Sequence, residues 1–400
     1  MRLKTIDKAD VRNKKVLVRV DFNVFVEDGK IEDDFRIRRV VPTLKYLAKN
    51  KAKVIVMAHF GRPIDEKTGA IDRINFSMKN IAQRLAKDIG HKVVFASDCV
   101  GEKAQRASIK LKSGEILMLE NLRFHPEEEK NDEVFASRLA SLADIYVNEA
   151  FSVSHRAHAS VSAITRFLPS YAGFVLAEEV KILHHTYHKP KLPLVIVMGG
   201  AKVETKLKLI QRFFDKSDNI LLGGLIANQV LKAKGVGIGK SKIDPTVSVT
   251  LKDLDWTSPK LHLPVDVVVA KEISPDAWVK RVGVGKVEDD ELILDIGADT
   301  TELFSNIAAN AKTIIWNGPL GYSELPNFAV GTDSFAKAIA RSKAFRVMGG
   351  GESIAALDRL GLYDKIDFVS TGGGAMLEFL AGEPMPGIEA LQNQKSKIKM

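Results

Sequence analysis

The chain has 400 residues, 45% of them hydrophobic and 27% charged, and a formal net charge of +9 at pH 7. This length exceeds what one hydrophobic core usually supports, so we expect two domains. No apolar run approaches the roughly 18 residues of a membrane span, and the sequence after Met1 has no apolar signal-peptide core. Cys99 is the only cysteine, which excludes an internal disulfide and is typical of a reducing compartment. These features predict a cytoplasmic protein without a membrane partner.

The excess of basic residues indicates anionic partners. Lys and Arg are scattered along the chain, and the sequence has neither an RNA-binding aromatic signature nor a zinc-finger spacing. We therefore expect small anionic ligands and no nucleic acid.

Short apolar runs alternate with helix-like stretches, which predicts an α/β fold with mostly parallel strands. The strand-like runs are at residues 16–20, 54–58, 116–119, 145–147, 194–198, 220–222, 346–348 and 367–371. Apolar residues three and four apart predict helices over 75–89, 205–216 and 353–361. A further helix over 175–188 ends before two prolines. It places the boundary between two lobes at residues 171–193, as a hinge helix and linker.

In the first half, the apolar runs end on charged or hydrogen-bonding residues. Ligands of open parallel sheets bind outside the carboxyl ends of the strands. Asp21 and Asn23 follow the first run, and His59 follows the second. Four arginines also follow strand-like runs or lie in the loop after one, namely Arg36, Arg62, Arg123 and Arg156. A single such arginine is usually a surface charge, but four guanidinium groups together predict a site for a small, highly anionic substrate.

In the second half, the runs end on glycines at 199–200, 223–224, 349–351 and 372–374. Glycine between a strand and a helix lets backbone N–H groups approach phosphate oxygens, and the helix dipole favours the negative charge. Lys202 and Lys206 lie four residues apart on one face of a starting helix. The pattern predicts a nucleotide site, although no Walker motif is present.

An anion site in one lobe and a nucleotide site in the other are the plan of a two-substrate phosphotransferase. Transfer between oxygens that are already ionised needs alignment and charge stabilisation rather than a general base. A catalytically silent binder of sugar phosphates or nucleic acid remains the alternative. Arg36, Lys202, Lys206 and both glycine triplets favour the enzyme, because a binder need not keep both halves.

The sequence resembles the phosphoglycerate kinase family. The resemblance rests on seven motifs that follow the family's order, at residues 19–24, 59–63, 120–124, 199–206, 316–319, 349–351 and 370–375. It implies reversible phosphoryl transfer from 1,3-bisphosphoglycerate to ADP, giving 3-phosphoglycerate and ATP, with Mg²⁺ and in a cytoplasmic monomer. It implies two Rossmann-like lobes, at 1–170 and 194–375, with the segment from about 376 to 400 returning to the first lobe.

The resemblance also implies roles for individual residues. The phosphoglycerate site comprises Asp21, Asn23, Arg36, His59, Arg62, Arg123 and Arg156. The transferring phosphoryl group is stabilised by Arg36, Lys202, Gly349 and Gly372. The nucleotide site comprises Lys206, Gly297, Asn317, Glu324, Gly350, Gly351, Glu352 and Ser353, with Pro319 beside it. The family usually has Asp-Thr where this chain has Glu352-Ser353, so Glu352 is the expected carboxylate at the metal.

Overall fold

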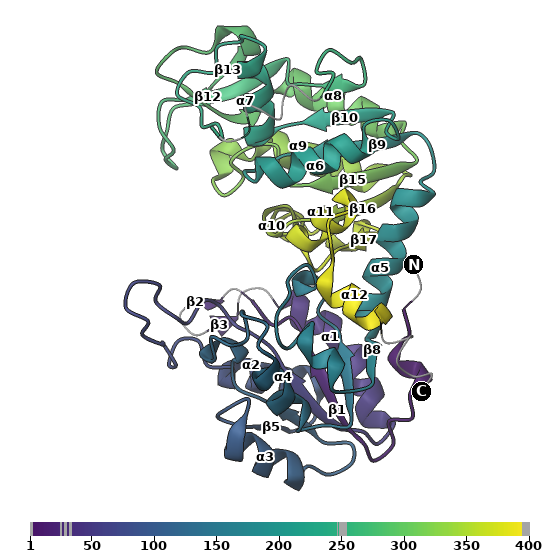
Figure 1. The fold of residues 1–400 in the computed structure, drawn as a ribbon. Helices are drawn as coiled ribbons and strands as arrows, with labels where there is room; N and C mark the ends of the chain where they lie inside the picture. The colour runs from purple at the N-terminus through teal and green to yellow at the C-terminus, as the bar shows by residue number, and fades with distance from the viewer. Residues whose placement is uncertain are drawn as a thin grey trace. The chain divides into compact units, whose positions relative to one another are not determined.

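The structure is a computed structural model that describes residues 3–24, 26–27, 30–31, 34–245, 247 and 254–393 (Figure 1). The chain divides into two compact units. Unit 1 comprises residues 1–182 and 384–400, and unit 2 comprises residues 183–383. The first boundary lies inside the predicted hinge region, and the second lies at 384 rather than near 376. None of the helices in the described ranges is long and apolar enough to cross a membrane.

Unit 1 is built on a six-stranded sheet with the order β5-β6-β4-β1-β7-β8. Its strands are β1 (Lys15–Arg19), β4 (Lys53–Met57), β5 (Val93–Phe95), β6 (Ile116–Met118), β7 (Ile145–Asn148) and β8 (Ser170–Ala172). Every neighbouring pair is parallel, and Val18 of β1 pairs with Val56 of β4 on one side and Val147 of β7 on the other. All carboxyl ends therefore lie at one edge of this sheet.

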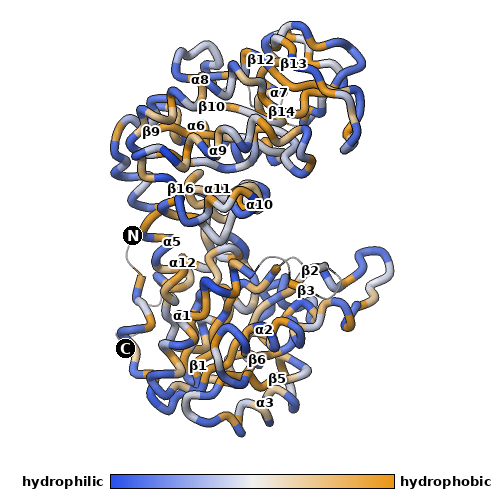
Figure 2. The backbone as a smooth tube through the Cα atoms, turned by 180° about the vertical axis from the view of Figure 1, so that it is seen from behind, coloured by the Kyte–Doolittle hydropathy of each residue, from blue (hydrophilic) through white to orange (hydrophobic). Residues whose placement is uncertain are grey.

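Helices cover the unit 1 sheet. They are α1 (Phe35–Lys49), α2 (Lys79–Ile89), α3 (Gly101–Lys110), α4 (Glu133–Ala140), α12 (Pro386–Asn393) and the first part of α5 (Phe174–His188). Leu44 of α1 and Leu85 of α2 share a buried core with Val18 and Val56, and hydrophobic colouring runs along β1 and β6 in Figure 2. A short antiparallel pair is formed by β2 (Val26–Glu27) and β3 (Lys30–Ile31).

The apolar spacing predicted a helix that begins at Asn75, but helix α2 begins at Lys79. The carboxylate of Glu120 accepts hydrogen bonds from the hydroxyl of Ser77 and from the amide of Met78. These contacts hold the preceding residues in a loop, so tertiary hydrogen bonds override the local helical pattern.

Unit 2 contains a second six-stranded parallel sheet with the order β11-β10-β9-β15-β16-β17. Its strands are β9 (Leu194–Met198), β10 (Asn219–Leu222), β11 (Leu261–His262), β15 (Thr313–Asn317), β16 (Phe345–Gly349) and β17 (Phe368–Val369). Its helices are α6 (Val203–Phe213), α7 (Gly224–Ala233), α8 (Ala298–Ala309), α9 (Val330–Arg341), α10 (Gly351–Arg359) and α11 (Gly373–Ala381). Both α6 and α10 begin two residues earlier than predicted, α6 three residues after Gly200 and α10 at Gly351, the last glycine of its triplet.

A three-stranded antiparallel sheet in unit 2 was not predicted from the sequence. It has the order β13-β12-β14, with β12 (Asp266–Ala270), β13 (Lys280–Gly283) and β14 (Leu292–Ile296). The two large parallel sheets flanked by helices nevertheless confirm the predicted α/β class with two Rossmann-like lobes.

Candidate active site

Four adjacent parallel strands of unit 1 bring the predicted polar residues to one edge of the sheet. The order β6-β4-β1-β7 places their carboxyl ends side by side. Asp21 and Asn23 follow β1, His59 and Arg62 follow β4, Arg123 follows β6, and Arg156 follows β7. These residues span the sequence from Asp21 to Arg156, and the parallel pairing of the strands brings them together.

A hydrogen-bonded cluster follows β1. Oδ1 of Asp21 accepts from the amide of Asn23 at 2.9 Å, and Asp21 also accepts from the hydroxyl of Ser152. Nη1 of Arg36 donates to the carbonyl of Asn23 at 2.6 Å and lies 3.3 Å from Oδ2 of Asp21. Oδ1 of Asn23 in turn accepts from the amide of Gly61 at 2.9 Å. The loops after β1 and β4 are therefore fixed to one another.

Three arginines line one cavity of about 400 Å³ in unit 1, namely Arg62, Arg123 and Arg156. Nη1 of Arg123 donates to the carbonyl of Gly61 at 2.7 Å, and its Nη2 lies 2.6 Å from Oε1 of Glu129. Burial lowers the pKa of this guanidinium, and Nε has no hydrogen-bond partner among the described residues. The cavity therefore has three guanidinium groups against the carboxylates of Glu66 and Glu129, and Arg123 keeps one buried donor without a partner in the described ranges.

His59 does not line this cavity, but it is 5% exposed and lies close enough to Arg123 and Arg36 for their charges to act on its ring. Burial, followed by the positive charges of Arg19 and Arg123, lowers its pKa well below the ordinary value of 6.5. His59 is consequently a neutral imidazole at physiological pH, able to donate one hydrogen bond.

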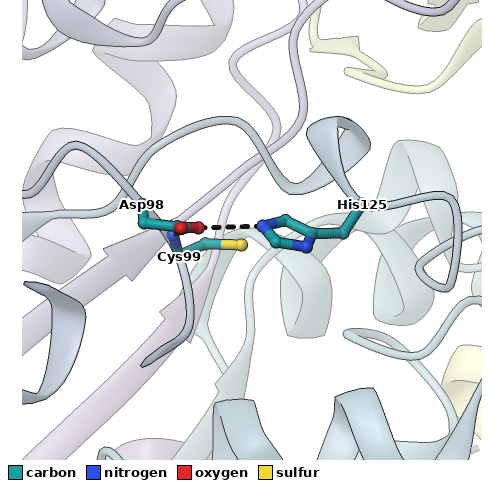
Figure 3. Close-up of side chains that lie close together, drawn as sticks. All are labelled: Asp98, Cys99 and His125. Carbon is teal, nitrogen blue, oxygen red and sulfur yellow. Dashed lines mark hydrogen bonds and ion pairs between the residues drawn. The ribbon is translucent and has the colours of Figure 1, made fainter. Parts of the chain in front are cut away.

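His125 also lines this cavity, and it belongs to the group of side chains shown in Figure 3. The ligating atoms of Asp98, Cys99 and His125 all lie within 4.8 Å of one another. Oδ1 of Asp98 lies 2.8 Å from Nε2 of His125 and accepts from the amide of Cys99 at 2.7 Å. Burial and the adjacent carboxylate raise the pKa of the thiol, so Cys99 is not a thiolate. The contacts within this group hold His125 at the cavity wall.

In unit 2, the two glycine triplets lie against one another. A Cβ on Gly373 would lie 2.7 Å from Cα of Gly350, whose φ of +105° favours glycine. The triplets open α10 and α11, so the N-termini of two helices are adjacent. A Cβ on Gly351 would meet no atom within 4 Å. This end of α10 therefore has open space beside amides that can approach phosphate.

The two lysines after β9 have different surroundings. Lys202 precedes α6 and is exposed, whereas Lys206 is 4% exposed. Burial lowers the pKa of Lys206 to about 8, and Glu352 opposes this shift. A Cβ on Gly200 would lie 3.1 Å from Nζ of Lys206 and 3.3 Å from Oε2 of Glu352. The lysine and the carboxylate therefore both lie beside Gly200, whose positive φ favours glycine.

Asn317 lies beside Gly350, and Ser353 contacts Gly318. Asn317 ends β15 and is 4% exposed, and its Nδ2 is a buried donor with no partner among the described residues. The hydroxyl of Ser353 is completely buried and accepts from the amide of Gly318 at 2.9 Å. Ser353 therefore fixes the backbone beside Asn317, and the amide of Asn317 is the donor that lacks an acceptor.

A cavity of about 300 Å³ in unit 2 adjoins these groups and is lined by Gly200, Pro319, Glu324 and Glu352. Gly297 is the N-cap of α8 and does not line it, whereas the preceding Ile296 does. Its apolar wall includes Leu225, Val267 of β12 and Leu292 of β14. The sequence reading missed the contribution of β12 and β14. The run Asp266-Val267-Val268-Val269-Ala270 was the available signal, because β-branched residues favour strands.

This chain is similar throughout its length to known phosphoglycerate kinases. The family model described as phosphoglycerate kinase matches residues 6–383. The chain is 43% identical over 396 residues to the phosphoglycerate kinase of Pelotomaculum thermopropionicum, covering 98% of this chain and 99% of that one. It is 44% identical over 403 residues to that of Wolbachia pipientis, with coverage of 98% and 100%.

Solved structures of this family have the same fold. The phosphoglycerate kinase of Coxiella burnetii is 37% identical and superposes with a TM-score of 0.84, covering 98% of this chain and 99% of that chain. The enzyme of Pyrococcus horikoshii is 34% identical and superposes with a TM-score of 0.87, with coverage of 99% and 100%. The chain therefore belongs to the phosphoglycerate kinase family.

Proposed function

We propose that unit 1 binds the phosphoglycerate and unit 2 the nucleotide, in reversible phosphoryl transfer from 1,3-bisphosphoglycerate to ADP. As a member of its family, this chain is a kinase. The observation that carries the division of labour is that the residues after β6, β4, β1 and β7 share one edge of the unit 1 sheet. The glycine-rich helix starts all belong to unit 2.

The arginine site suits a triose carrying phosphate and carboxylate. Arg62 and Arg156 are exposed and line the cavity, and their planar guanidinium groups can bind phosphate oxygens bidentately. Asp21 and Asn23 supply hydrogen-bonding groups for a hydroxyl, and His59 supplies a neutral N–H donor. We assign phosphoglycerate binding to these residues together with Arg36 and Arg123.

The nucleotide site is assigned to unit 2. The apolar cavity walls suit a base, and Glu324 lies among them. We assign Lys206 and the amides of Gly350 and Gly351 to the phosphate oxygens, because Lys206 lies beside Gly200 and a Cβ on Gly351 would meet open space. We keep Gly297 in the proposed nucleotide site, because the adjacent Ile296 forms part of the cavity wall.

The residues of unit 2 fit a nucleotide that carries Mg²⁺. The carboxylate of Glu352 lines the cavity, and the buried amide of Asn317 lacks an acceptor in the described part of the chain. Ser353 holds the intervening backbone. Bound with the nucleotide, Mg²⁺ would neutralise charge on the phosphate oxygens. We assign Glu352 as the protein carboxylate that would hold it.

Transfer requires stabilisation of charge on the moving phosphoryl group. We assign this role to the positive charges of Arg36 and Lys202. The backbone N–H groups of Gly349 and Gly372 add hydrogen-bond donors. The reacting oxygens are ionised before transfer, so no general base is required. The low pKa of His59 supports this assignment, because a neutral imidazole that cannot readily take up a proton is suited to donate a hydrogen bond.

The two substrate sites belong to different units, whereas the reacting atoms must approach to about 3–3.5 Å. We propose that the units close on one another when both substrates bind, with the hinge in the region of α5. Closure would also exclude water from the phosphoryl group. We further propose a monomer acting in the cytoplasm, consistent with a site assembled within one chain.

A coupled assay for ATP-dependent formation of 1,3-bisphosphoglycerate tests the function directly. The wild-type chain should be active, while Arg36→Ala and Lys202→Ala should lower kcat by orders of magnitude with little change in KM for ATP. Calorimetry with 3-phosphoglycerate and with ATP, run beside this assay, distinguishes the kinase from a catalytically silent binder. Binding of either ligand without any turnover by the wild-type chain would favour a silent binder.

A further inference from the structure

Arg19, the last residue of β1, is a charged residue buried inside the unit 1 sheet. Its exposed fraction is 0%. No carboxylate lies within ion-pair distance of it in the part of the chain that the structure describes. Burying a charge without a direct counter-charge is costly, so its neighbours must satisfy the guanidinium by hydrogen bonds.

Each nitrogen of this guanidinium donates to a different acceptor. Nε donates to the hydroxyl of Ser160 at 2.9 Å, Nη1 donates to the carbonyl of Val20, and Nη2 lies 3.0 Å from Nδ1 of His59. Val20 follows β1 directly, and His59 follows β4. The three contacts therefore fix the guanidinium plane in one orientation between two neighbouring strand ends.

The contact with His59 determines where the imidazole proton lies. A guanidinium has only donors, so Nδ1 of His59 must be the unprotonated acceptor. The single ring proton of a neutral imidazole then lies on Nε2. Burial, followed by the positive charges of Arg19 and Arg123, disfavours a second proton and lowers the pKa of His59. No described residue accepts a hydrogen bond from Nε2.

The far side of Arg19 is anchored as firmly. Ser160 accepts from Nε of Arg19 and donates its own hydroxyl proton to Oε1 of Glu128 at 2.5 Å. The amide of Ser160 donates to Oε2 of Glu128 at 2.9 Å. Glu128 is completely buried, and the charge of Arg19 opposes the rise in its pKa that burial causes. Arg19 thus donates in two directions, to His59 on one side and to Ser160 on the other, and Ser160 donates in turn to the Glu128 carboxylate.

We propose that Arg19 is a positioning residue that fixes His59 as the tautomer with its proton on Nε2, ready to donate to an oxygen of the anion in the arginine site. The identity of that anion rests on the proposed function, whereas the tautomer does not. Arg19 acts through His59 and does not touch the substrate. Without this contact, both tautomers of His59 become accessible, and the tautomer protonated on Nδ1 offers a lone pair instead of a donor.

Nitrogen-15 NMR of the full chain labelled at histidine tests the tautomer without any ligand. Long-range proton–nitrogen correlations distinguish a protonated ring nitrogen from an unprotonated one. In the wild-type chain, Nε2 of His59 should be protonated and Nδ1 unprotonated, unchanged between pH 6 and 8. Arg19→Met should give averaged nitrogen shifts or a titration in this range. A wild-type His59 protonated on Nδ1, or titrating near pH 6.5, would overturn the proposal.

A double-mutant cycle separates positioning from charge and from folding. Arg19→Met should weaken 3-phosphoglycerate binding by about 10- to 100-fold, the scale of a hydrogen bond to a charged group. In a His59→Gln background, whose amide donor needs no tautomer, the same substitution should cost clearly less. Arg19→Lys keeps one donor and should recover part of the binding if Arg19→Met folds poorly. Equal losses in both backgrounds would show that Arg19 acts through charge or scaffold alone.

The NMR and binding measurements fail independently. If the wild-type chain does not bind 3-phosphoglycerate, the proposed function fails while the tautomer result still decides the role of Arg19. If the chain binds 3-phosphoglycerate but His59 shows the other tautomer, the positioning role fails and the proposed function stands.

Discussion

Oε2 of Glu149 accepts a hydrogen bond from the amide of Val175 at 3.0 Å, so a carboxylate that follows β7 caps the first turn of α5. The same oxygen accepts from the amide of Leu176, and Oε1 accepts from the hydroxyl of Thr43 on α1. Since α5 contains the boundary between the units, this buried group anchors the start of the proposed hinge helix.

Glu149 should make the stability of unit 1 depend on pH. Burial raises its pKa from 4.5 to about 7. Between these values the folded chain holds a proton that the unfolded chain has lost, so stability falls as pH rises from 4.5 to 7 and is then level. Glu149→Gln has a neutral amide that does not titrate, so its stability does not fall with pH for this reason. Urea unfolding should show the variant gaining about 3 kcal/mol relative to wild type across that range.

The control for this prediction is Glu178→Gln, which removes a more exposed carboxylate from the same helix without touching the cap. Parallel stability curves for wild type and Glu149→Gln between pH 5 and 8 would show that Glu149 does not titrate in this range.

Arg62 and Arg156 should govern phosphoglycerate affinity and not nucleotide affinity. Both are exposed at the unit 1 cavity, whereas Arg123 is also tied to Gly61 and Glu129, so replacing it would disturb the loops. Arg62→Ala or Arg156→Ala should weaken 3-phosphoglycerate binding by about 1.5–3 kcal/mol. Calorimetry with ATP is the matched measurement, and an equal loss of ATP affinity would contradict the division between units.

Lys206 should couple nucleotide binding to proton uptake. Its pKa of about 8 in the free chain reflects burial, and neighbouring phosphate oxygens would raise it again. Binding then takes up a proton above pH 8, so nucleotide affinity should fall by up to about tenfold per pH unit. Calorimetry at pH 8.5 in buffers of different ionisation enthalpy measures this uptake. Lys206→Arg stays charged and should lose the pH dependence, and a flat wild-type profile from pH 7.5 to 9 would refute the coupling.

Glu352 should set the magnesium requirement. It lies in the first turn of α10 and lines the nucleotide cavity. Glu352→Gln keeps the shape but removes the charge, so it should raise the Mg²⁺ concentration needed for half-maximal activity and lower kcat by about tenfold, roughly 1.4 kcal/mol. Glu352→Asp should remain active. Full activity of Glu352→Gln at low Mg²⁺ would mean that this carboxylate does not hold the metal.

Binding of both substrates should compact the molecule. Small-angle scattering should give a smaller radius of gyration with 3-phosphoglycerate and a non-hydrolysable ATP analogue together than with either alone, because only the pair makes closure favourable. The Arg62→Ala variant at matched nucleotide concentration is the control. An unchanged radius in the presence of both ligands would exclude closure.

The apolar runs of the sequence were enough to predict the α/β framework. Apolar runs ending at Asp21, His59 or Gly199 alternate with helix-like stretches, which predicted mostly parallel strands, because helices on both faces of a parallel sheet hide such runs from water. Parallel pairing has one polarity, so residues that follow different strands must share an edge, and the clustering of Arg62 with Arg123 could be anticipated. The assigned roles of these residues remain predictions for the experiments above.

Other features depend on contacts between distant parts of the chain, which local sequence patterns do not reveal. Helix α2 starts at Lys79 because Glu120, distant in sequence, holds the residues before it. Val267 of β12 and Leu292 of β14 line the same cavity although they are far apart in the sequence. In the sequence, Arg19 cannot be distinguished from any other arginine at the end of a strand. Its donors nevertheless contact acceptors 1, 40 and 141 positions away. Burial and hydrogen-bond direction depend on neighbours in space, and sequence spacing does not encode them.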